Sequence, residues 1–322
     1  MSLSVGKLRG LQQCSTPDDL FVIMALDHRN VLQTALNPSN PDSISYSEMA
    51  IFKTEVTRAL SPVSSAVLLD PEYGAAQAIA ANAISGSCGL MVSLEETGYT
   101  DKPSTRKTQI LPDWSVEQVA RIGASAAKLM LYYHPEAKNA EAQEMLVREV
   151  ANMCRQYDLA FFLQPLSYSL DSSKKLSSAE KRAIVVETAR RLSPLGIDIL
   201  KTEFPVDIDE VTDEGEWADA CTELNEASAT PWVLLSAGMD FDRFLRQTEV
   251  ACKAGAGGVM AGRAVWWEAV ELRGDAQMDF LYKTAIDRIV ALGDVISEYG
   301  TPWTDYYSSS ITDIPVDWYE SY

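Results

Sequence analysis

The chain has 322 residues, of which 47% are hydrophobic, and its 46 acidic and 27 basic residues give a formal net charge of −19. A charge of this sign argues against partners such as nucleic acid or an anionic membrane surface. No stretch of about 18 apolar residues predicts a membrane-spanning helix. The N-terminus also lacks the apolar core of a signal peptide. Length and apolar content together suit one large α/β domain.

The numbers and spacing of the cysteines and histidines further narrow the possible classes of protein. The five cysteines are widely spaced and include no Cys-x-x-Cys pair. This is not the pattern of a disulfide framework, so we expect a soluble protein of the reducing cytoplasm. His28 and His134 are the two histidines, and they lack the spacing of zinc ligands. We therefore expect no metal and no cofactor, with lysine and carboxylate side chains as the candidates for catalysis.

Eight short, almost continuously apolar segments recur along the chain, as expected for parallel strands that are covered on both faces. Polar stretches with helical spacing separate most of them. This alternation predicts a single (β/α)8 TIM barrel, with an open doubly wound sheet as the alternative. No GxGxxG motif follows the first segment, which weakens the alternative. The expected strands span residues 20–28, 66–70, 89–95, 126–133, 159–168, 197–205, 231–238 and 257–266.

Two terminal segments lie outside this alternation, although we assign residues 1–322 to one domain. Residues 1–19 are expected to cap the bottom of the barrel. Residues 301–322 contain two tryptophans and four tyrosines among acidic residues. We expect this aromatic tail to pack on its own domain or on a partner subunit rather than to bind a ligand.

Lys201 lies near the end of the apolar segment 197–205. Burial favours the neutral form of an amine, and a neutral amine can form a Schiff base with a ketone. Since side chains alternate along a strand, Glu203 would share a face with Lys201 and place a proton-handling carboxylate beside it. A surface ion pair between the two residues is the alternative interpretation.

Lys128 is a second lysine inside an apolar segment. It could lower the pKa of Lys201 or hold a substrate hydroxyl or carboxylate. The alternative is a structural ion pair with Asp27 or Glu95, which also stand at expected strand ends.

The last two strands predict an anion site, because loops after the seventh and eighth strands of such barrels commonly hold phosphate. Arg263 could add a bidentate contact. Arg106, in the loop after the third strand, is either a second anion contact or part of a solvated turn. The expected contacts of the anion are Ser236, Gly238, Gly262 and Arg263.

These residues together resemble the class I tagatose-1,6-bisphosphate aldolase family and the similar sulfofructose-phosphate aldolases. The resemblance extends from the first strand to the eighth, in order and spacing. The segments that carry it are LLDPEYG (68–74), ETGY (96–99), LPDWS (111–115), KLMLYY (128–133), FFLQPLSY (161–168), LKTEFPV (200–206), LLSAG (234–238) and GRAVW (262–266).

The resemblance implies a barrel enzyme that cleaves ketose phosphates through a lysine Schiff base without a metal. Lys201 would be the Schiff-base lysine, flanked by Asp27 and Lys128. The C1 phosphate would lie on Ser236, Gly238, Gly262 and Arg263.

Gln164 departs from the family pattern, because it stands where these aldolases typically have a glutamate that handles protons. Glutamine forms hydrogen bonds but cannot titrate. Either another group moves the proton, namely Glu203, Asp27 or the substrate phosphate, or the substrate differs.

We therefore expect retro-aldol cleavage of a ketose 1-phosphate, such as tagatose 1,6-bisphosphate, to dihydroxyacetone phosphate and an aldehyde such as glyceraldehyde 3-phosphate. One alternative is sulfofructose 1-phosphate as substrate, with sulfolactaldehyde as the product. Others are an isomerase or epimerase that uses Lys201 only as a charge, and a regulator that binds sugar phosphates without turnover. The expected partners are a small-molecule sugar phosphate and further copies of the chain in a homo-oligomer.

Overall fold

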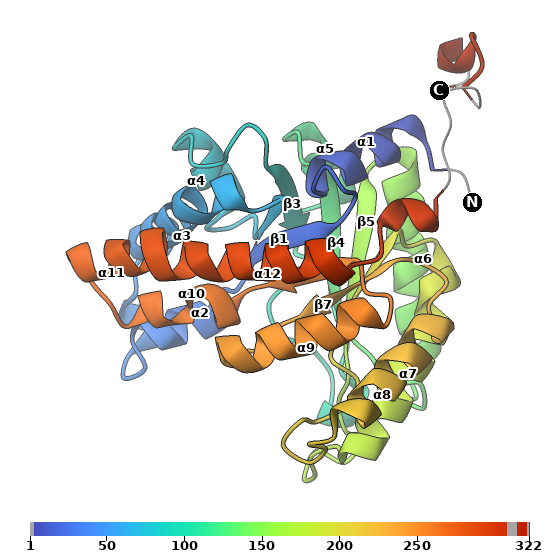
Figure 1. Ribbon diagram of the computed structural model, residues 1–322. Helices are drawn as coiled ribbons and strands as arrows, with labels where there is room; N and C mark the ends of the chain where they lie inside the picture. The colour runs from blue at the N-terminus through green and yellow to red at the C-terminus, as the bar shows by residue number, and fades with distance from the viewer. Residues whose placement is uncertain (1–2, 308–313, 321) are drawn as a thin grey trace.

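Eight parallel strands close into a barrel in the computed structural model, which describes residues 3–307, 314–320 and 322 (Figure 1). Each strand pairs with its neighbours in chain order, and β8 returns to β1. The predicted single-domain (β/α)8 barrel is confirmed, and the open sheet is wrong. The strands are β1 (Phe21–Leu26), β2 (Ala66–Leu69), β3 (Gly89–Ser93), β4 (Ala126–Tyr132), β5 (Ala160–Leu166), β6 (Ile199–Thr202), β7 (Trp232–Leu235) and β8 (Gly258–Ala261).

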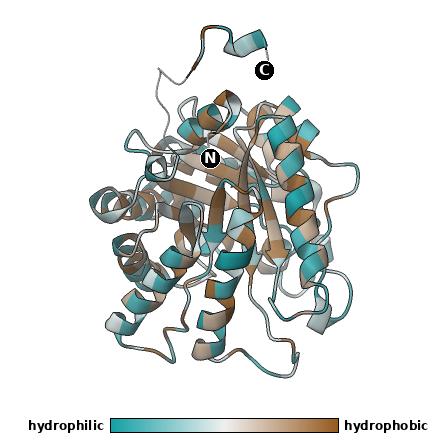
Figure 2. Ribbon diagram, turned by 90° about the vertical axis from the view of Figure 1, so that its right-hand side faces the viewer, coloured by the Kyte–Doolittle hydropathy of each residue, from teal (hydrophilic) through white to brown (hydrophobic). Residues whose placement is uncertain are grey.

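Helices form the outer layer of the barrel and expose their polar faces, whereas apolar residues gather on the strands (Figure 2). Local sequence determines where these helices begin, as the capping box at the start of one of them illustrates. In α7, Ser177 accepts a hydrogen bond from the backbone of Glu180, and the Glu180 side chain binds the backbone of Ser177 in return. The outer helices are α2 (Asn30–Leu36), α3 (Tyr46–Leu60), α4 (Ala75–Ala80), α5 (Val116–Arg121), α6 (Ala140–Gln156), α7 (Ser178–Leu192), α8 (Glu214–Ala227), α9 (Phe241–Lys253), α10 (Arg263–Trp266), α11 (Gly274–Phe280) and α12 (Ile286–Tyr299).

The strands are shorter than the apolar segments that predicted them. Segment 197–205 contains only the four residues of β6, and Glu203 lies beyond its end. Segment 257–266 was expected to be strand throughout, but β8 ends at Ala261 and Arg263 begins α10. The apolar segments are longer than the strands because apolar residues continue past the last hydrogen bond between strands. These residues belong to the turns that also carry the polar side chains of the cavity.

The interior of the barrel is closed at the end where the strands begin. Phe21 and Phe162 meet edge to face with ring centroids 5.6 Å apart, and Trp303 is buried in the same cluster. The N-terminal helix α1 (Val5–Cys14) is fastened to the barrel by Lys7, whose Nζ lies 2.7 Å from Asp198 Oδ2. This apolar layer fills the barrel interior at that end, and the cavity that contains Lys201 lies at the opposite end.

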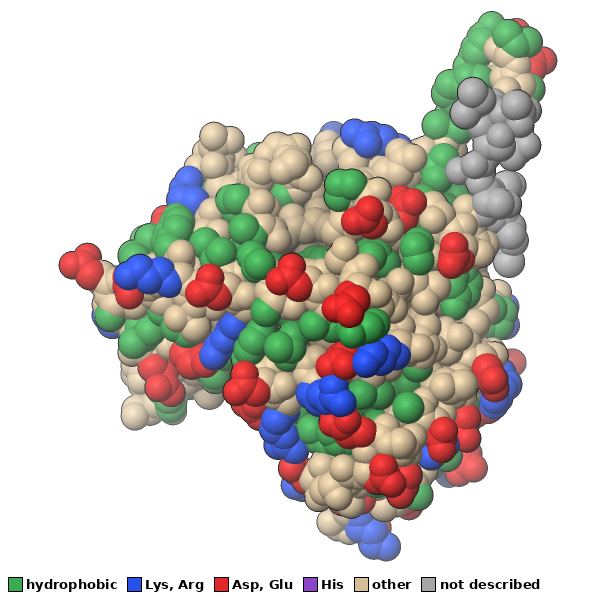
Figure 3. All heavy atoms as spheres, viewed as in Figure 1, with side chains coloured by type: hydrophobic (Ala, Val, Ile, Leu, Met, Phe, Trp, Pro, Cys, Tyr) green, Lys and Arg blue, Asp and Glu red, His purple; other side chains and the backbone are tan. Residues whose placement is uncertain are grey.

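The outer surface over α8, α9 and α12 carries acidic and basic side chains side by side (Figure 3). Many of them form exposed ion pairs, such as Lys253 with Glu249 at 2.6 Å. Such pairs contribute little to stability individually. Among the helices that the structure describes, none is both long and apolar enough to cross a membrane.

Candidate active site

A cavity of about 600 Å³ opens where the barrel strands end. It brings together eight of the ten site residues that the sequence predicted. Gly238 and Arg106 are not part of its lining; Gly238 lies against Arg263, and Arg106 lies against Tyr132, which does line the cavity. The eight are Asp27, Lys128, Gln164, Lys201, Glu203, Ser236, Gly262 and Arg263.

Lys201 on β6 is only 4% exposed, and within the described residues its amine forms no ion pair. Burial lowers the pKa of Lys201 to about 8, with further lowering by the charges of Lys128 and Arg263. The carboxylates of Asp27 and Glu95 oppose this shift without cancelling it. At neutral pH roughly a tenth of such an amine is unprotonated, against fewer than about one in a thousand for an ordinary lysine. This neutral fraction is the form in which an amine can act as a nucleophile.

Lys128 on β4 has the opposite character. Its Nζ lies 2.6 Å from Asp27 Oδ2 and also pairs with Glu95. Burial would lower the pKa of Lys128, but Asp27 and Glu95 outweigh burial and raise it. Burial would likewise raise the pKa of Asp27, yet the neighbouring Lys128 and Lys201 hold it well below its usual range. Lys128 is thus a fixed ammonium and Asp27 a fixed carboxylate.

Gln164 and Glu203 complete the part of the cavity next to Lys201. Leu163 of β5 pairs with Leu200 of β6, so the following residues, Gln164 and Lys201, are level. The side-chain oxygen of Gln164 is buried and has no hydrogen-bond partner in the described structure. Glu203 accepts a hydrogen bond from the backbone N–H of Ser167 at 2.7 Å. Gln164 therefore offers an unused acceptor to a ligand, and Glu203 is held as an oriented carboxylate.

The ends of β7 and β8 form a cradle around the Arg263 guanidinium. Gly238 has a φ of +79°, and a Cβ there would come within 2.8 Å of Arg263 Cζ, so this position requires glycine. The N–H of Gly262 donates a hydrogen bond to Ser236 Oγ at 3.2 Å. Burial lowers the pKa of Arg263 against the opposing charge of Asp27. An arginine among small residues and backbone amides is suited to binding a phosphate.

Two cavity residues were missed by the sequence analysis. Arg29 is buried, lies 2.7 Å from Glu72 and donates a hydrogen bond to the Glu95 carbonyl. Burial lowers the pKa of His28 to about 3, so this imidazole is neutral, and it packs against Trp266. The sequence feature that could have identified both residues is their position directly after Asp27, at the end of β1.

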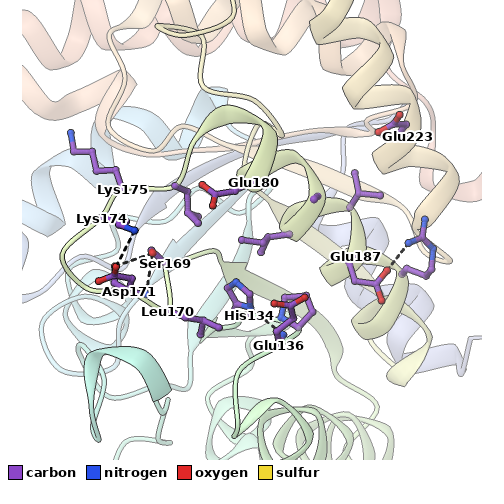
Figure 4. Close-up of a pocket in the computed structure, with 16 residues that line it drawn as sticks. His134, Glu136, Ser169, Leu170, Asp171, Lys174, Lys175, Glu180, Glu187 and Glu223 are labelled. Carbon is purple, nitrogen blue, oxygen red and sulfur yellow. Dashed lines mark hydrogen bonds and ion pairs between the residues drawn. The ribbon is translucent and has the colours of Figure 1, made fainter.

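A second cavity, of about 760 Å³, lies outside the barrel between α7 and the loops after β4 and β5 (Figure 4). Its charged groups largely satisfy each other: Lys174 lies 3.6 Å from Asp171, and Glu187 lies 2.6 Å from Arg190. Its lining includes neither Lys128 nor Lys201, so its greater volume does not make it the better candidate. Across the described parts of the chain, no group of three or more His, Cys, Asp or Glu side chains could hold a metal ion.

Fold and site together define a closed barrel whose cavity contains a buried lysine with a lowered pKa. A family model for DeoC/LacD family aldolases matches residues 21–268. The chain therefore belongs to the DeoC/LacD aldolase family and is an aldolase, a carbon–carbon lyase. The predicted family resemblance and the predicted enzyme class are confirmed.

Curated relatives extend the similarity over nearly the whole chain. Tagatose 1,6-diphosphate aldolase 2 of Streptococcus mutans is 29% identical, with 96% of this chain and 99% of the relative aligned. An enzyme of the same name from Enterococcus faecalis is 30% identical over 94% of this chain and 97% of its own length. The tagatose 1,6-diphosphate aldolase of Listeria monocytogenes is 28% identical, with 96% of this chain and 97% of the relative aligned.

Solved structures show the same fold at lower sequence identity. A Schiff-base-forming fructose-1,6-bisphosphate aldolase has a TM-score of 0.61 at 16% identity, covering 90% of this chain and 99% of its own. The fructose-bisphosphate aldolase of Slackia heliotrinireducens has a TM-score of 0.63 at 15% identity, covering 90% of each chain. At these identities the comparison supports the barrel fold.

The lowered pKa of Lys201 predicts the pH dependence of its reactivity. Because the neutral amine reacts, trapping of dihydroxyacetone phosphate on the enzyme by cyanoborohydride should accelerate with rising pH and level off above about 8. Lys128→Met removes a positive charge from this environment, so the inflection should move to higher pH. Lys128→Arg keeps the charge and should leave the inflection near its original position. An inflection near 10 in the unmodified enzyme would contradict the assignment.

Proposed function

We propose that this aldolase cleaves a ketose 1-phosphate through a Schiff base on Lys201, giving dihydroxyacetone phosphate and an aldehyde. The observation that carries the proposal is a buried lysine with a pKa of about 8, which has no carboxylate partner in the described structure while the neighbouring Lys128 has two. The names of the curated relatives support the same reaction, since those relatives are called tagatose 1,6-diphosphate aldolases.

The reaction begins when the Lys201 amine attacks the C2 carbonyl and forms a carbinolamine. The carbinolamine hydroxyl then takes up a proton from solvent and leaves as water, which gives an iminium ion. The Lys128 ammonium lines the same cavity, where it would donate a hydrogen bond to this hydroxyl. A base removes the C4 hydroxyl proton, and the aldehyde forms as the C3–C4 bond breaks. The electron pair of that bond moves into the iminium and produces an enamine. Protonation at C3 and hydrolysis then release dihydroxyacetone phosphate and restore the amine.

Gln164 cannot be the base, because an amide side chain does not titrate. Glu203 lines the same cavity, and the hydrogen bond from Ser167 N–H fixes the orientation of its carboxyl group. Asp27 is a weaker base, because its ion pair with Lys128 lowers its proton affinity. We therefore propose Glu203, or the substrate phosphate itself, as the group that moves the C4 proton.

The C1 phosphate fits the cradle formed by Ser236, Gly238, Gly262 and Arg263. Arg263 is the cation nearest to this group of small residues, and Gly238 gives it room. A phosphate oxygen could take over the Gly262 N–H that now donates to Ser236 Oγ. The hydroxyl of Ser236 would then be free to donate to the phosphate as well.

Tagatose 1,6-bisphosphate is the substrate that the names of the relatives suggest, with glyceraldehyde 3-phosphate as the second product. Sulfofructose 1-phosphate, which would give sulfolactaldehyde, is the second candidate. The observation that favours it is Gln164, where the resembled tagatose-bisphosphate aldolases have a glutamate. The family assignment argues against the isomerase and against the regulator without turnover.

We also propose that the enzyme acts in the cytoplasm as a homo-oligomer. Five free cysteines support a reducing compartment. Exposed apolar groups in the tail, including Val316 and Tyr319, support contact with another subunit.

Borohydride reduction in the presence of dihydroxyacetone phosphate should add one label per chain, mapped by mass spectrometry to the peptide that contains Lys201. Lys201→Ala should lose the label and several orders of magnitude in rate, because the covalent intermediate can no longer form. Treatment with EDTA should leave the activity of the unmodified enzyme intact. A label on Lys128, or activity that is lost on chelation and restored by zinc, would overturn the proposal.

Arg263→Ala should weaken binding of phosphorylated ketoses by about 2–3 kcal/mol, seen as a rise of roughly 30- to 150-fold in KM, because a charge-assisted contact to phosphate is lost. Inorganic phosphate should inhibit the variant less strongly in parallel. Arg148→Ala, which removes an exposed arginine on α6, is the charge-matched control and should leave KM unchanged. An unaltered KM in Arg263→Ala would place the phosphate elsewhere.

Gln164→Glu separates a proton-transfer role at this position from a specificity role. If Gln164 orients the substrate, the added carboxylate should lower kcat/KM, because it repels an anionic or hydroxyl-rich substrate. We expect this outcome, since an active enzyme with Gln164 already moves its protons through another group. Faster cleavage of a bisphosphorylated ketose, together with a new acidic limb in the pH profile, would show instead that the glutamine replaces a proton-transfer acid.

A further inference from the structure

Arg288 on α12 contacts the helix that carries the cation of the phosphate cradle. Its Nη1 donates hydrogen bonds to the backbone carbonyls of Ala264 at 3.3 Å and Val265 at 3.1 Å. Both carbonyls belong to α10, the single helical turn that begins with Arg263. The last carbonyls of a helix lack partners within the helix, and basic side chains are common donors to them. Arg288 therefore holds the element from which Arg263 extends.

The same guanidinium also contacts the β7 side of the cradle. Its central carbon lies 5.2 Å from the ring centroid of Phe241, the first residue of α9. The loop between β7 and Phe241 contains Ser236 and Gly238. An aromatic ring face attracts a cation, so Arg288 also holds the end of this loop. One side chain thus contacts the elements that follow both strands of the cradle.

The loop after β7 depends on support from its surroundings, because its backbone is strained. Ala237 has a φ of +49° and Gly238 a φ of +79°, so two consecutive residues adopt the left-handed region. This region is unfavourable for alanine, unlike glycine, because of its Cβ. A strained conformation persists only where the surrounding structure maintains it. Since Gly238 lies against the Arg263 guanidinium, a shift of the loop would also move that cation.

Arg288 is itself held by partners on two other elements. Its guanidinium forms two hydrogen bonds with the Glu268 carboxylate, at 2.9 Å and 2.6 Å. The ring centroid of Phe280, at the end of α11, lies 5.5 Å from its central carbon. A π-helical turn (Leu281–Ala285) joins α11 to α12, between Phe280 and Arg288 (Figure 1). Such turns are rare and frequently occur at functional sites. Arg288 is therefore a fixed point for the loops that it contacts.

We propose that Arg288 is a positioning residue for the phosphate cradle and keeps α10 and the loop after β7 in the arrangement that binds the C1 phosphate. This inference rests on the proposed retro-aldol function and adds a residue outside the cavity to the determinants of phosphate affinity. Arg288 is not part of the cavity lining, so it acts through Arg263 and Gly238 and not by contact with substrate. Its loss should weaken phosphate binding while Lys201 still reacts with a ketone.

The test compares two ketones that differ only in the phosphate, dihydroxyacetone phosphate and dihydroxyacetone, each trapped on the enzyme by cyanoborohydride. In Arg288→Ala the concentration of dihydroxyacetone phosphate that gives half-maximal trapping should rise about 5- to 20-fold, because misplaced positioning groups cost up to about a hundredfold. Inhibition by inorganic phosphate should weaken in parallel. Trapping of dihydroxyacetone should change by less than about twofold, which also shows that the variant is folded.

Two further variants separate the backbone contacts from the ion pair. Glu268→Gln keeps an acceptor for the guanidinium and keeps its contacts to the α10 carbonyls, so it should weaken trapping of the phosphorylated ketone less than Arg288→Ala does. Arg288→Lys keeps the positive charge with fewer donors, so its effect should be intermediate. It also provides the measurement if the alanine variant does not fold. Arg246→Ala is the control, because it removes an exposed α9 arginine that pairs with Glu214, and it should leave trapping of both ketones unchanged.

A loss confined to the phosphorylated ketone supports the positioning role of Arg288. An equal loss with both ketones, or no loss with either, overturns it. A loss in Glu268→Gln as large as that in Arg288→Ala would also overturn it, because the ion pair would then be the contact that matters. Absence of trapping by dihydroxyacetone phosphate in the unmodified enzyme would instead refute the proposed function, and unaltered phosphate affinity in Arg263→Ala would refute the cradle.

Discussion

Carboxylates pair with only one of the two buried lysines that face the cavity, and the chemistry of the site depends on this asymmetry. Lys128 takes both Asp27 and Glu95 as partners, which keeps it charged. Its charge then helps to lower the pKa of Lys201, which burial alone already disfavours as an ammonium. The pKa of one lysine is thereby raised and that of the other lowered, although both are the same residue type in similarly apolar strands.

The apolar lower half of the barrel is what makes this arrangement possible. Positions that face inward along one strand change from apolar to polar or charged on approach to the mouth, as in Ile23, Ala25 and Asp27 or in Phe162 and Gln164. The aromatic layer at the closed end keeps water away from the base of the cavity, so desolvation can act on Lys201. A polar or loosely packed floor would hydrate the amine and return its pKa toward the ordinary value.

The fold could be predicted from sequence because each strand is buried on both faces and therefore reads as an apolar segment. The strand-end residues could be predicted for the same reason, since a lysine inside such a segment is conspicuous. Arg29 could not be identified in this way, because its role depends on Glu72 and the Glu95 carbonyl, which belong to other strands. The environment of Arg106 was equally hidden, since the rings that it faces, those of Tyr99, Tyr132 and Tyr168, come from separate segments. Contacts of this kind exist only once the barrel closes.

The order of the strands places the different polar groups of the cavity on successive strands of one side of the barrel. Arg263 follows β8, Lys201 stands on β6, and Lys128 stands on β4. Gln164 on β5 is level with Lys201 on the neighbouring strand. A carboxylate in that position would repel an anionic ligand, whereas a neutral amide can accept a hydrogen bond from a hydroxyl without repelling the anion. Gln164 therefore leaves the surroundings of Lys201 less negative than a glutamate in its place would.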